Sequence, residues 1–210
     1  MANDRFITFE GIEASGKSTQ LNLVYNFLVK NKIKCIKTRE PGGTPISEKI
    51  RKIIINDLKN NEDVLTELLL LFAARANHFK KIKSYLKKGY VVLCDRYVDS
   101  TYVYQHFEQG QDIKFINQIQ NKIDNGLKPK ITFYLDIPIK VSKQRLKKRK
   151  KIDRFDKYNV IKLNKLRSSF LKLCNRHKRI VKINGIKNTS EITGEIINYL
   201  KKKNVIKNIK

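Results

Sequence analysis

The chain has 210 residues, of which 40% are hydrophobic, and a formal net charge of +27. That size favours one core and a single domain over residues 1–210, and no apolar run reaches the roughly 18 residues that a membrane span needs. The excess positive charge comes mainly from lysine, with 35 lysines against 11 arginines, spread along a chain that is also rich in isoleucine and asparagine. All three residue types can be encoded by A/T-only codons, so a biased genome accounts for the charge. Nucleic-acid binding is therefore not favoured as the main role.

The first predicted elements are a strand at residues 6–10, a glycine-rich loop and a helix from Thr19. The loop, residues 11–18, reads G-I-E-A-S-G-K-S and fits the phosphate-binding pattern G-x-x-x-x-G-K-[S/T]. Its glycines let backbone N–H groups surround a phosphate, and the helix N-terminus adds partial positive charge. We expect Lys17 to reach the β- and γ-phosphates of a nucleoside triphosphate and Ser18 to bind its Mg²⁺. A plain glycine turn is the alternative, but the strand and helix on either side favour a phosphate loop.

The rest of the chain alternates between strands and helices. Further strands are predicted at 34–38, 90–94, 130–136 and 179–183. Helices are predicted at 19–29, 46–58, 64–87, 138–149, 158–176 and 190–202, with one or two more over 101–125 and a break at Asn60 and Asn61. This alternation predicts a three-layer α/β fold of the P-loop NTPase type, with a central parallel sheet of about five strands and helices on both faces.

Asp95 and Arg96 directly follow the apolar strand at 90–94. In a parallel sheet, functional side chains gather at the carboxyl edge of the strands. Phosphoryl transfer depends on positive charge positioned around the moving phosphoryl group, which suits Arg96. A carboxylate at a strand end of a P-loop protein is typical of a magnesium site, which suits Asp95.

One short motif points elsewhere. Residues 121–124 read N-K-I-D, which matches the guanine-reading N-K-x-D pattern of GTPases. Here the motif lies in a run with apolar residues at helical spacing rather than after a buried strand, and the chain has no D-x-x-G. The pattern therefore indicates a helix and a chance match.

Several blocks, in order along nearly the whole chain, resemble the thymidylate kinase family, which makes dTDP from dTMP and ATP. These blocks are residues 9–19 (the phosphate loop), 38–44 (T-R-E-P-G-G-T), 92–101 (with D-R-Y-V-D-S-T), 134–136 (Y-L-D) and 153–156 (D-R-F-D). The resemblance implies ATP and Mg²⁺ as cofactors and dTMP as the substrate. Residues of the loop would bind ATP: Gly11, Ile12, Glu13, Ala14, Ser15, Gly16, Lys17, Ser18 and Thr19.

The resemblance also implies residues for the dTMP site. Arg51 and Arg96 would hold its phosphate, and Glu13 would face its sugar. At the base, Arg75 would reach the thymine carbonyl. Ser100 and Gln105 would line the base pocket. From the residues alone, Arg51 also reads as a surface charge on a basic helix, and Arg75 as half of a structural ion pair.

A basic segment at about 145–156, named here the lid segment, would close over the site. Some relatives carry an arginine where this chain has Ala14, so the catalytic charge is expected from the lid. The candidates are Arg145, Arg149 and Arg154. We favour Arg149 as the catalytic arginine, with Arg154 supporting the closed lid. Lys17 and Arg96 complete the predicted catalytic set. An exposed basic helix is the alternative for this segment.

The chain departs from the family pattern at two places. The family has phenylalanine four residues before the pocket arginine, whereas this chain has Leu71 there and Phe72 one residue later. We expect Phe72 to stack on the base from a shifted helix, or Leu71 to pack on it. After Gln105 the family's G-x-G-R-G is missing, and His106 is read as a loop histidine. The resemblance also suggests a cis peptide bond at Pro41.

Partners and location follow from the same features. The odd, scattered cysteines Cys35, Cys94 and Cys174 show no disulfide framework, and the polar start at residues 1–4 leaves no room for a signal peptide. We therefore expect a cytoplasmic enzyme without membrane partners, and a homodimer is open because residues 68–72 suit core or interface. Two other functions stay open: another nucleoside-monophosphate or deoxynucleoside kinase, and a basic P-loop protein that binds nucleic acid.

Overall fold

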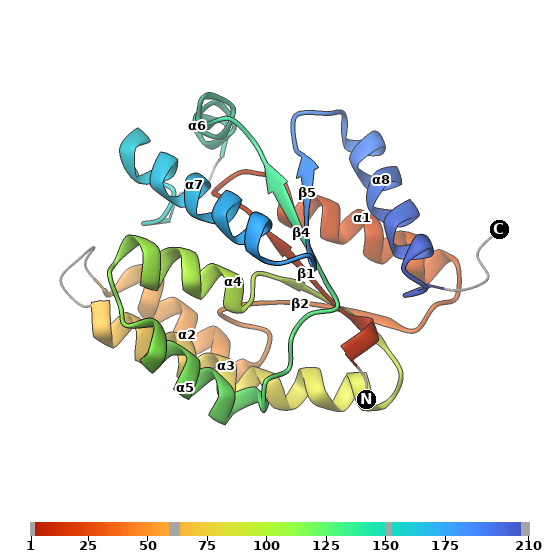
Figure 1. Cartoon of the computed structure of the whole chain (residues 1–210), viewed down its shortest axis with the longest axis horizontal. Coiled ribbons are helices and arrows are strands. Elements are labelled where there is room, and N and C mark those ends of the chain that lie inside the picture. The colour runs from red at the N-terminus through yellow and green to blue at the C-terminus, as the bar shows by residue number, and fades with distance from the viewer. Residues whose placement is uncertain (1–2, 59–63, 150–152, 207–210) are drawn as a thin grey trace.

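The computed structural model describes residues 3–58, 64–149 and 153–206 (Figure 1). The predicted break at Asn60 and Asn61 lies outside these residues. The described strands are β1 (Phe6–Glu10), β2 (Cys35–Arg39), β3 (Val91–Asp95), β4 (Ile131–Asp136) and β5 (Ile180–Asn184). They form one sheet in the order β2-β3-β1-β4-β5, and every pairing is parallel. The predicted fold class, with its parallel sheet of about five strands, is confirmed.

Helices cover both faces of this sheet (Figure 1). They are α1 (Lys17–Lys30), α2 (Pro45–Asn56), α3 (Val64–Lys87), α4 (Val98–Thr101), α5 (Ile113–Asp124), α6 (Ile139–Lys147), α7 (Val160–Arg176) and α8 (Thr189–Lys202), with a short 3-10 turn η1 (Asn3–Arg5) and a π-helix η2 (Tyr102–Glu108). On one face, α1 and α8 pack on apolar side chains such as Phe9 and Phe133. On the other, α3 packs on Val92, and α7 packs on Tyr134. Burial on both faces explains why the strands read as continuous apolar runs.

Local signals in the sequence fix several helix starts. Thr44 accepts a hydrogen bond from the backbone N–H of Ser47 and precedes Pro45, the first residue of α2. Asn159 and Asn188 cap α7 and α8 in the same way. Such caps satisfy backbone donors that have no partner within the helix. The predicted bounds of the helices therefore lie within a few residues of the observed ones.

The region predicted as one or two helices over 101–125 has three parts: α4, η2 and α5. Gly110, at a φ of 78°, follows η2, and Asp112 then caps α5 by accepting from the N–H of Lys114. The N-K-I-D motif lies on α5, as predicted. No helix in the described part of the chain is long and apolar enough to cross a membrane.

Candidate active site

The phosphate loop, residues 11–18, joins β1 to α1 and curls round the ammonium group of Lys17. The Nζ atom donates to the carbonyl oxygens of Gly11 at 3.0 Å and Ile12 at 2.9 Å. A Cβ atom at Gly11 would lie 2.6 Å from Oγ of Ser15, so only glycine fits there. Burial and the nearby Arg96 lower the pKa of Lys17 to about 8. The strand–loop–helix context predicted for this motif is confirmed.

The two predicted magnesium ligands touch each other. The Ser18 hydroxyl, on the first turn of α1, donates a hydrogen bond to Oδ2 of Asp95 at the end of β3. Both side chains line the same cavity as Lys17. Strand β3 pairs with β1, so its carboxyl end lies beside the phosphate loop. Ser18 and Asp95 therefore present oxygen atoms, the ligands that Mg²⁺ prefers, next to the phosphate loop.

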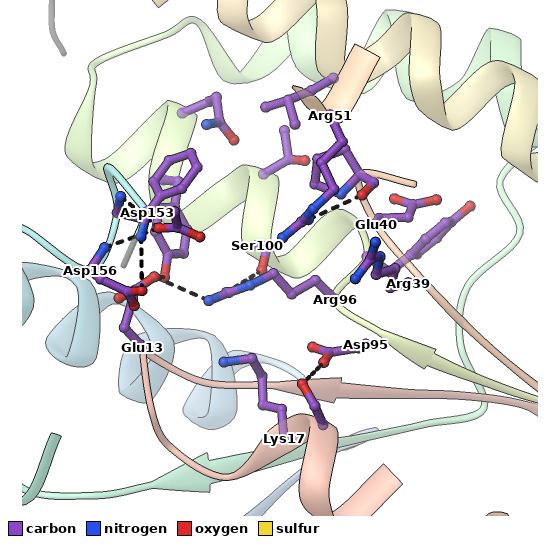
Figure 2. A pocket seen from close by; sticks show the side chains of 18 of the residues that line it. Glu13, Lys17, Arg39, Glu40, Arg51, Asp95, Arg96, Ser100, Asp153 and Asp156 are labelled. Carbon is purple, nitrogen blue, oxygen red and sulfur yellow. Dashed lines mark hydrogen bonds and ion pairs between the residues drawn. The ribbon is translucent and has the colours of Figure 1, made fainter. Parts of the chain in front are cut away.

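Arg96 lies at the centre of the site, above Lys17 and Asp95 (Figure 2). Its backbone is in the left-handed region, with a φ of 68°. The guanidinium group donates to Oγ of Ser100 at 3.0 Å and to Oε1 of Glu13 at 3.2 Å. Strain of this kind at a non-glycine residue is typical of a functional position. The structure thus brings three of the predicted substrate residues into direct contact.

Glu13 is buried, and its two carboxylate oxygens differ. Oε1 accepts from the Tyr104 hydroxyl at 2.6 Å and from Arg96. Oε2 is buried and has no hydrogen-bond partner among the residues that the structure describes. A buried acceptor without a donor is costly, so this oxygen is suited to accept from a ligand hydroxyl or from water.

Beneath Ser100 lies Glu10, to which the sequence assigned no role. Its Oε2 atom accepts from the Ser100 hydroxyl at 2.6 Å, and its Oε1 atom accepts from the backbone N–H of Tyr97 at 2.8 Å. Burial and the neighbouring Asp99 raise the pKa of Glu10 to about 7. Glu10 therefore holds the turn that carries Arg96 and Ser100.

Arg75 on α3 reaches the cavity and also forms an ion pair. Its Nε atom donates to Oε2 of Glu40 at 2.7 Å, and Nη2 donates to Oγ1 of Thr101 at 2.9 Å. His78 also contacts Glu40, at 3.0 Å. Burial would raise the pKa of Glu40, but the charges of Arg75 and His78 hold it below its ordinary value. The alternative reading of Arg75 as half of a structural ion pair is therefore confirmed, with Glu40 as a partner that the sequence did not indicate, and its contact with the thymine carbonyl stays a prediction.

Arg51 on α2 reaches the same cavity from the other side. Its guanidinium donates to the Pro41 carbonyl at 3.1 Å, and the Glu40–Pro41 peptide bond is cis, as the resemblance suggested. Burial and the nearby Arg39 lower the pKa of Arg51. Among the described residues, no carboxylate forms an ion pair with Arg51. A partly buried cation of this kind is well suited to an anionic ligand.

The cavity has a volume of about 230 Å³. Of the residues predicted for the site, those that line it are Glu13, Ala14, Lys17, Ser18, Arg51, Arg75, Asp95, Arg96, Ser100, Gln105 and Arg149. A second hollow of about 350 Å³ lies on the other side of the phosphate loop, lined by Ser15, Gly16, Thr19, Arg145 and Gly185 among others. Arg149 lines both spaces, so the lid segment adjoins the two hollows.

Phe72 does not line the cavity, contrary to its predicted stacking role; Leu71 does. Phe72 is buried against Leu68 and against Ile116 of α5. One residue along a helix turns the side chain by about 100°, which separates the two positions. Phe72 therefore supports the wall from behind, and Leu71 forms its inner surface.

The two lid arginines have different surroundings. Arg149 pairs with Asp156 at 2.9 Å, and its side chain is 45% exposed. Arg154 is buried, donates to Oε2 of Glu67 on α3, and stands outside the cavity lining. Its guanidinium lies over the ring of Phe155, 4.5 Å from the centroid. Residues 150–152 of the lid segment lie outside the described residues.

The site contains acidic and aromatic residues that the sequence did not indicate: Glu10, Glu40, Glu67, Tyr104 and Asp156. Glu67 carried the clearest signal, because it stands directly before an apolar run on a helix. A buried carboxylate needs a partner, but the sequence does not show which residue supplies it.

Comparisons with known proteins agree on one family. The model of the thymidylate kinase family matches residues 9–196. The chain is 43% identical, over 203 residues, to a thymidylate kinase of Sulfurihydrogenibium sp. (strain YO3AOP1), with 96% of this chain and 98% of that one covered. It is 40% identical to a thymidylate kinase of Thermosipho africanus, covering 94% and 98%. The crystal structure of the thymidylate kinase from Ehrlichia chaffeensis is similar, with a TM-score of 0.71, 32% identity, and coverage of 93% and 98%.

Proposed function

Because the chain belongs to the thymidylate kinase family, we propose that its cavity holds dTMP and that the hollow behind the phosphate loop holds ATP. The chain phosphorylates dTMP to dTDP with ATP as the phosphoryl donor. The observation that carries the proposal is that the phosphate loop, including its Glu13, meets Arg51 and Arg96 in one cavity.

The acceptor lies with its phosphate between Arg51 and Arg96, which reach the cavity from α2 and from the end of β3. Its sugar hydroxyl donates to Oε2 of Glu13. The base lies against Leu71, with Arg75 at its far edge. Ser100 and Gln105 line the rest of the base pocket. Two arginines from different elements fix a phosphate in place, and that positioning supplies much of the rate of a phosphoryl transfer.

ATP lies along residues 11–19, with its phosphates on the backbone N–H groups of the loop and on Lys17. Ser18 and Asp95 fit Mg²⁺, since both present oxygen atoms at the cavity and the metal takes most of its other ligands from phosphates and water. When bound, Mg²⁺ would neutralise charge on the transferred phosphoryl group. In the described residues no group of three or more histidine, cysteine or acidic side chains forms a metal site, which suits an ion carried by the nucleotide.

In the transfer, a phosphate oxygen of dTMP attacks the γ-phosphorus, and the bond to the β-γ bridging oxygen breaks to release ADP. The attacking phosphate oxygen is already an anion at neutral pH, so no general base is required. Lys17, Arg96 and Arg149 surround the γ-phosphoryl group and neutralise its charge. Arg149 adjoins the loop at Ala14, where some relatives carry an arginine, and it has a solvent-exposed side chain that can move.

Arg154 holds the lid segment in place rather than touching ATP. Its buried ion pair with Glu67 ties residues 153–156 of the lid segment to α3. Closure of the lid segment excludes water and so limits wasteful hydrolysis of ATP. In this proposal residues 1–210 form one domain.

A homodimer and a cytoplasmic location complete the proposal. The apolar stretch 68–72 is divided: Leu68 is buried, whereas Leu69 is 47% exposed. Ile46 on α2 and Leu65 on α3 are also exposed, on two helices that pack together. Apolar exposure of this kind favours a self-association surface. The three cysteines are free, as in a reducing compartment.

A coupled assay of ADP release across dTMP, dUMP, dCMP, dGMP, AMP and thymidine tests the function. We expect dTMP to have the highest kcat/KM. Equal rates for several monophosphates, or faster phosphorylation of thymidine, would contradict the assignment. Salt-sensitive DNA binding without kinase turnover would favour the nucleic-acid alternative.

A further inference from the structure

Glu67, on the first turn of α3, is a buried carboxylate that three side chains contact. Only 4% of its side chain is exposed. Its Oε1 atom accepts from Nε2 of Gln105 at 2.8 Å and from Nε2 of Gln109 at 3.2 Å. Its Oε2 atom accepts from Arg154 of the lid segment. Every one of these contacts uses the carboxylate as an acceptor.

An ionised carboxylate has no proton to donate, so it determines how its neighbours orient. The Gln105 amide must direct its nitrogen, not its oxygen, towards Glu67. Gln105 itself lines the cavity and is 3% exposed. Because Nε2 of Gln105 donates to Glu67, the other terminal atom of the same amide, Oε1 of Gln105, remains as a hydrogen-bond acceptor for a ligand.

We propose that Glu67 is a positioning residue for base selection, because it holds Gln105 with its oxygen available as an acceptor at the base end of the cavity. Thymine carries a donor at N3, which satisfies that oxygen. Cytosine carries an acceptor at N3, which leaves two acceptors facing each other. This inference rests on the proposed function, in which the base of dTMP lies in this cavity.

Arg154 supplies the positive charge that pairs with the buried Glu67 carboxylate. An unpaired buried charge is strongly unfavourable, whereas a paired one is tolerated. Arg154 comes from the lid segment, 87 positions away along the chain. The cation that anchors the lid therefore also stabilises the charge that orients Gln105.

Glu67→Gln is the central variant. Glutamine can donate as well as accept, so Gln105 becomes free to turn and present Nε2 to cytosine. We expect the ratio of kcat/KM for dTMP to that for dCMP to fall roughly ten-fold or more, since sites built on hydrogen bonds discriminate strongly by unpaired groups. Glu108→Gln is the matched control: Glu108 pairs with Lys162 at 3.1 Å and does not line the cavity, so its ratio should equal that of the wild type.

A double-mutant comparison separates positioning from a general structural role. Gln105→Leu removes the acceptor, and adding Glu67→Gln to it should change the ratio no further, because Glu67 acts through Gln105. If Glu67→Gln fails to fold by circular dichroism, Glu67→Asp, which retracts the acceptor by one methylene, should lower the ratio in the same direction. An unchanged ratio in a folded, active Glu67 variant, or an undiminished effect in the Gln105→Leu background, overturns the proposal. Absence of any dTMP preference in the wild type would instead overturn the proposed function.

Discussion

Arg96 donates a hydrogen bond to Glu13 across 3.2 Å, and this contact joins the end of β3 to the phosphate loop after β1. The donor-nucleotide side and the acceptor side of the reaction therefore meet in one pair of residues. Glu13 lies within the loop that surrounds ATP phosphates, yet its buried carboxylate faces Arg96 and Tyr104. In the proposed function, the phosphate loop of this chain is thus half of a two-substrate site.

Glu13 is expected to select for a sugar hydroxyl. Its Oε2 atom is buried and has no partner within the described residues, so a 3′-hydroxyl group would satisfy it. We expect the wild type to use dTMP with a kcat/KM roughly 10²-fold above that for 3′-deoxy-dTMP, a difference of about 3 kcal/mol. Steady-state kinetics with both nucleotides measures this. In Glu13→Ala the two substrates should become nearly equal; a persisting preference would place the hydroxyl elsewhere.

Lys17 is expected to make ATP binding depend on pH. Its pKa is lowered to about 8, chiefly by burial and then by Arg96, and the negative phosphates of bound ATP should raise it again. Below pH 8, Lys17 of the free enzyme already carries its proton. Above pH 8, Lys17 of the free enzyme has lost this proton, and ATP binding must be accompanied by proton uptake. The affinity for ATP should therefore fall as the pH rises from 8 to 9.5. Calorimetry in buffers of different ionisation enthalpy counts the protons.

The matched variant for this effect is Lys17→Ala. It should take up no such proton, and its turnover should fall on the order of 10²-fold or more while the fold persists. A normal kcat in this variant would refute the assignment of the phosphate loop.

Arg149 and Arg154 should differ in their kinetics. Arg149→Ala should lower kcat by about 10³-fold, within the range for an arginine that neutralises a moving phosphoryl group, with a smaller change in the KM for dTMP. Arg154→Ala leaves Glu67 with a buried charge, so we expect lower thermal stability and more ATP hydrolysis without acceptor. Stopped-flow turnover and melting curves of both variants decide between them. A larger loss of kcat in Arg154→Ala would move the catalytic role to that residue.

Leu71 and Phe72 offer a paired test of the cavity wall. Leu71→Phe places a ring against the base, and stacking worth about 1–3 kcal/mol should lower the KM for dTMP roughly ten-fold. Phe72→Leu changes the packing against Leu68 and Ile116 and removes the ring that lies 5.4 Å from the Arg75 guanidinium. Glu40 and Thr101 still hold Arg75, so this variant should reduce stability by a few kcal/mol at most and change the KM for dTMP far less than Leu71→Phe does. An effect of Phe72→Leu on KM with unaltered stability would show that Phe72 touches the base.

Glu10 should make the stability of the fold depend on pH. Its folded-state pKa is about 7, raised mainly by burial and also by Asp99, above the ordinary value of an exposed glutamate. Between about pH 4.3 and pH 7, Glu10 therefore keeps its proton in the folded state, whereas the same residue in the unfolded chain has released it. Its contribution to stability is present below about pH 4.3 and is lost as pH rises through 7. Urea unfolding at pH 4.5, 6 and 8 should show a decline that is smaller in Glu10→Gln; equal slopes would exclude Glu10 as the cause.

Local patterns account for what could be predicted. The helix bounds followed apolar spacing, capping residues and glycines, all read within a few positions. The prediction for the N-K-I-D motif was correct for the same reason, because the helical spacing around Ile119 and Ile123 outweighed a four-letter match. Several of the predicted site residues reach one cavity because they lie in the phosphate loop or at the carboxyl end of β3.

The sequence by itself determined the phosphate loop, the parallel α/β fold and the family, because these depend on consecutive residues and on periodicity. Only the tertiary structure decided that Leu71 rather than Phe72 forms the wall, since a helix must be docked before its rotation is known. It alone paired Arg75 with Glu40, and Arg154 with Glu67, because a buried charge takes its partner from whichever segment the fold brings near. The sequence identifies the phosphate loop at residues 11–18, but only the folded structure shows that the Glu13 carboxylate of this loop contacts Arg96.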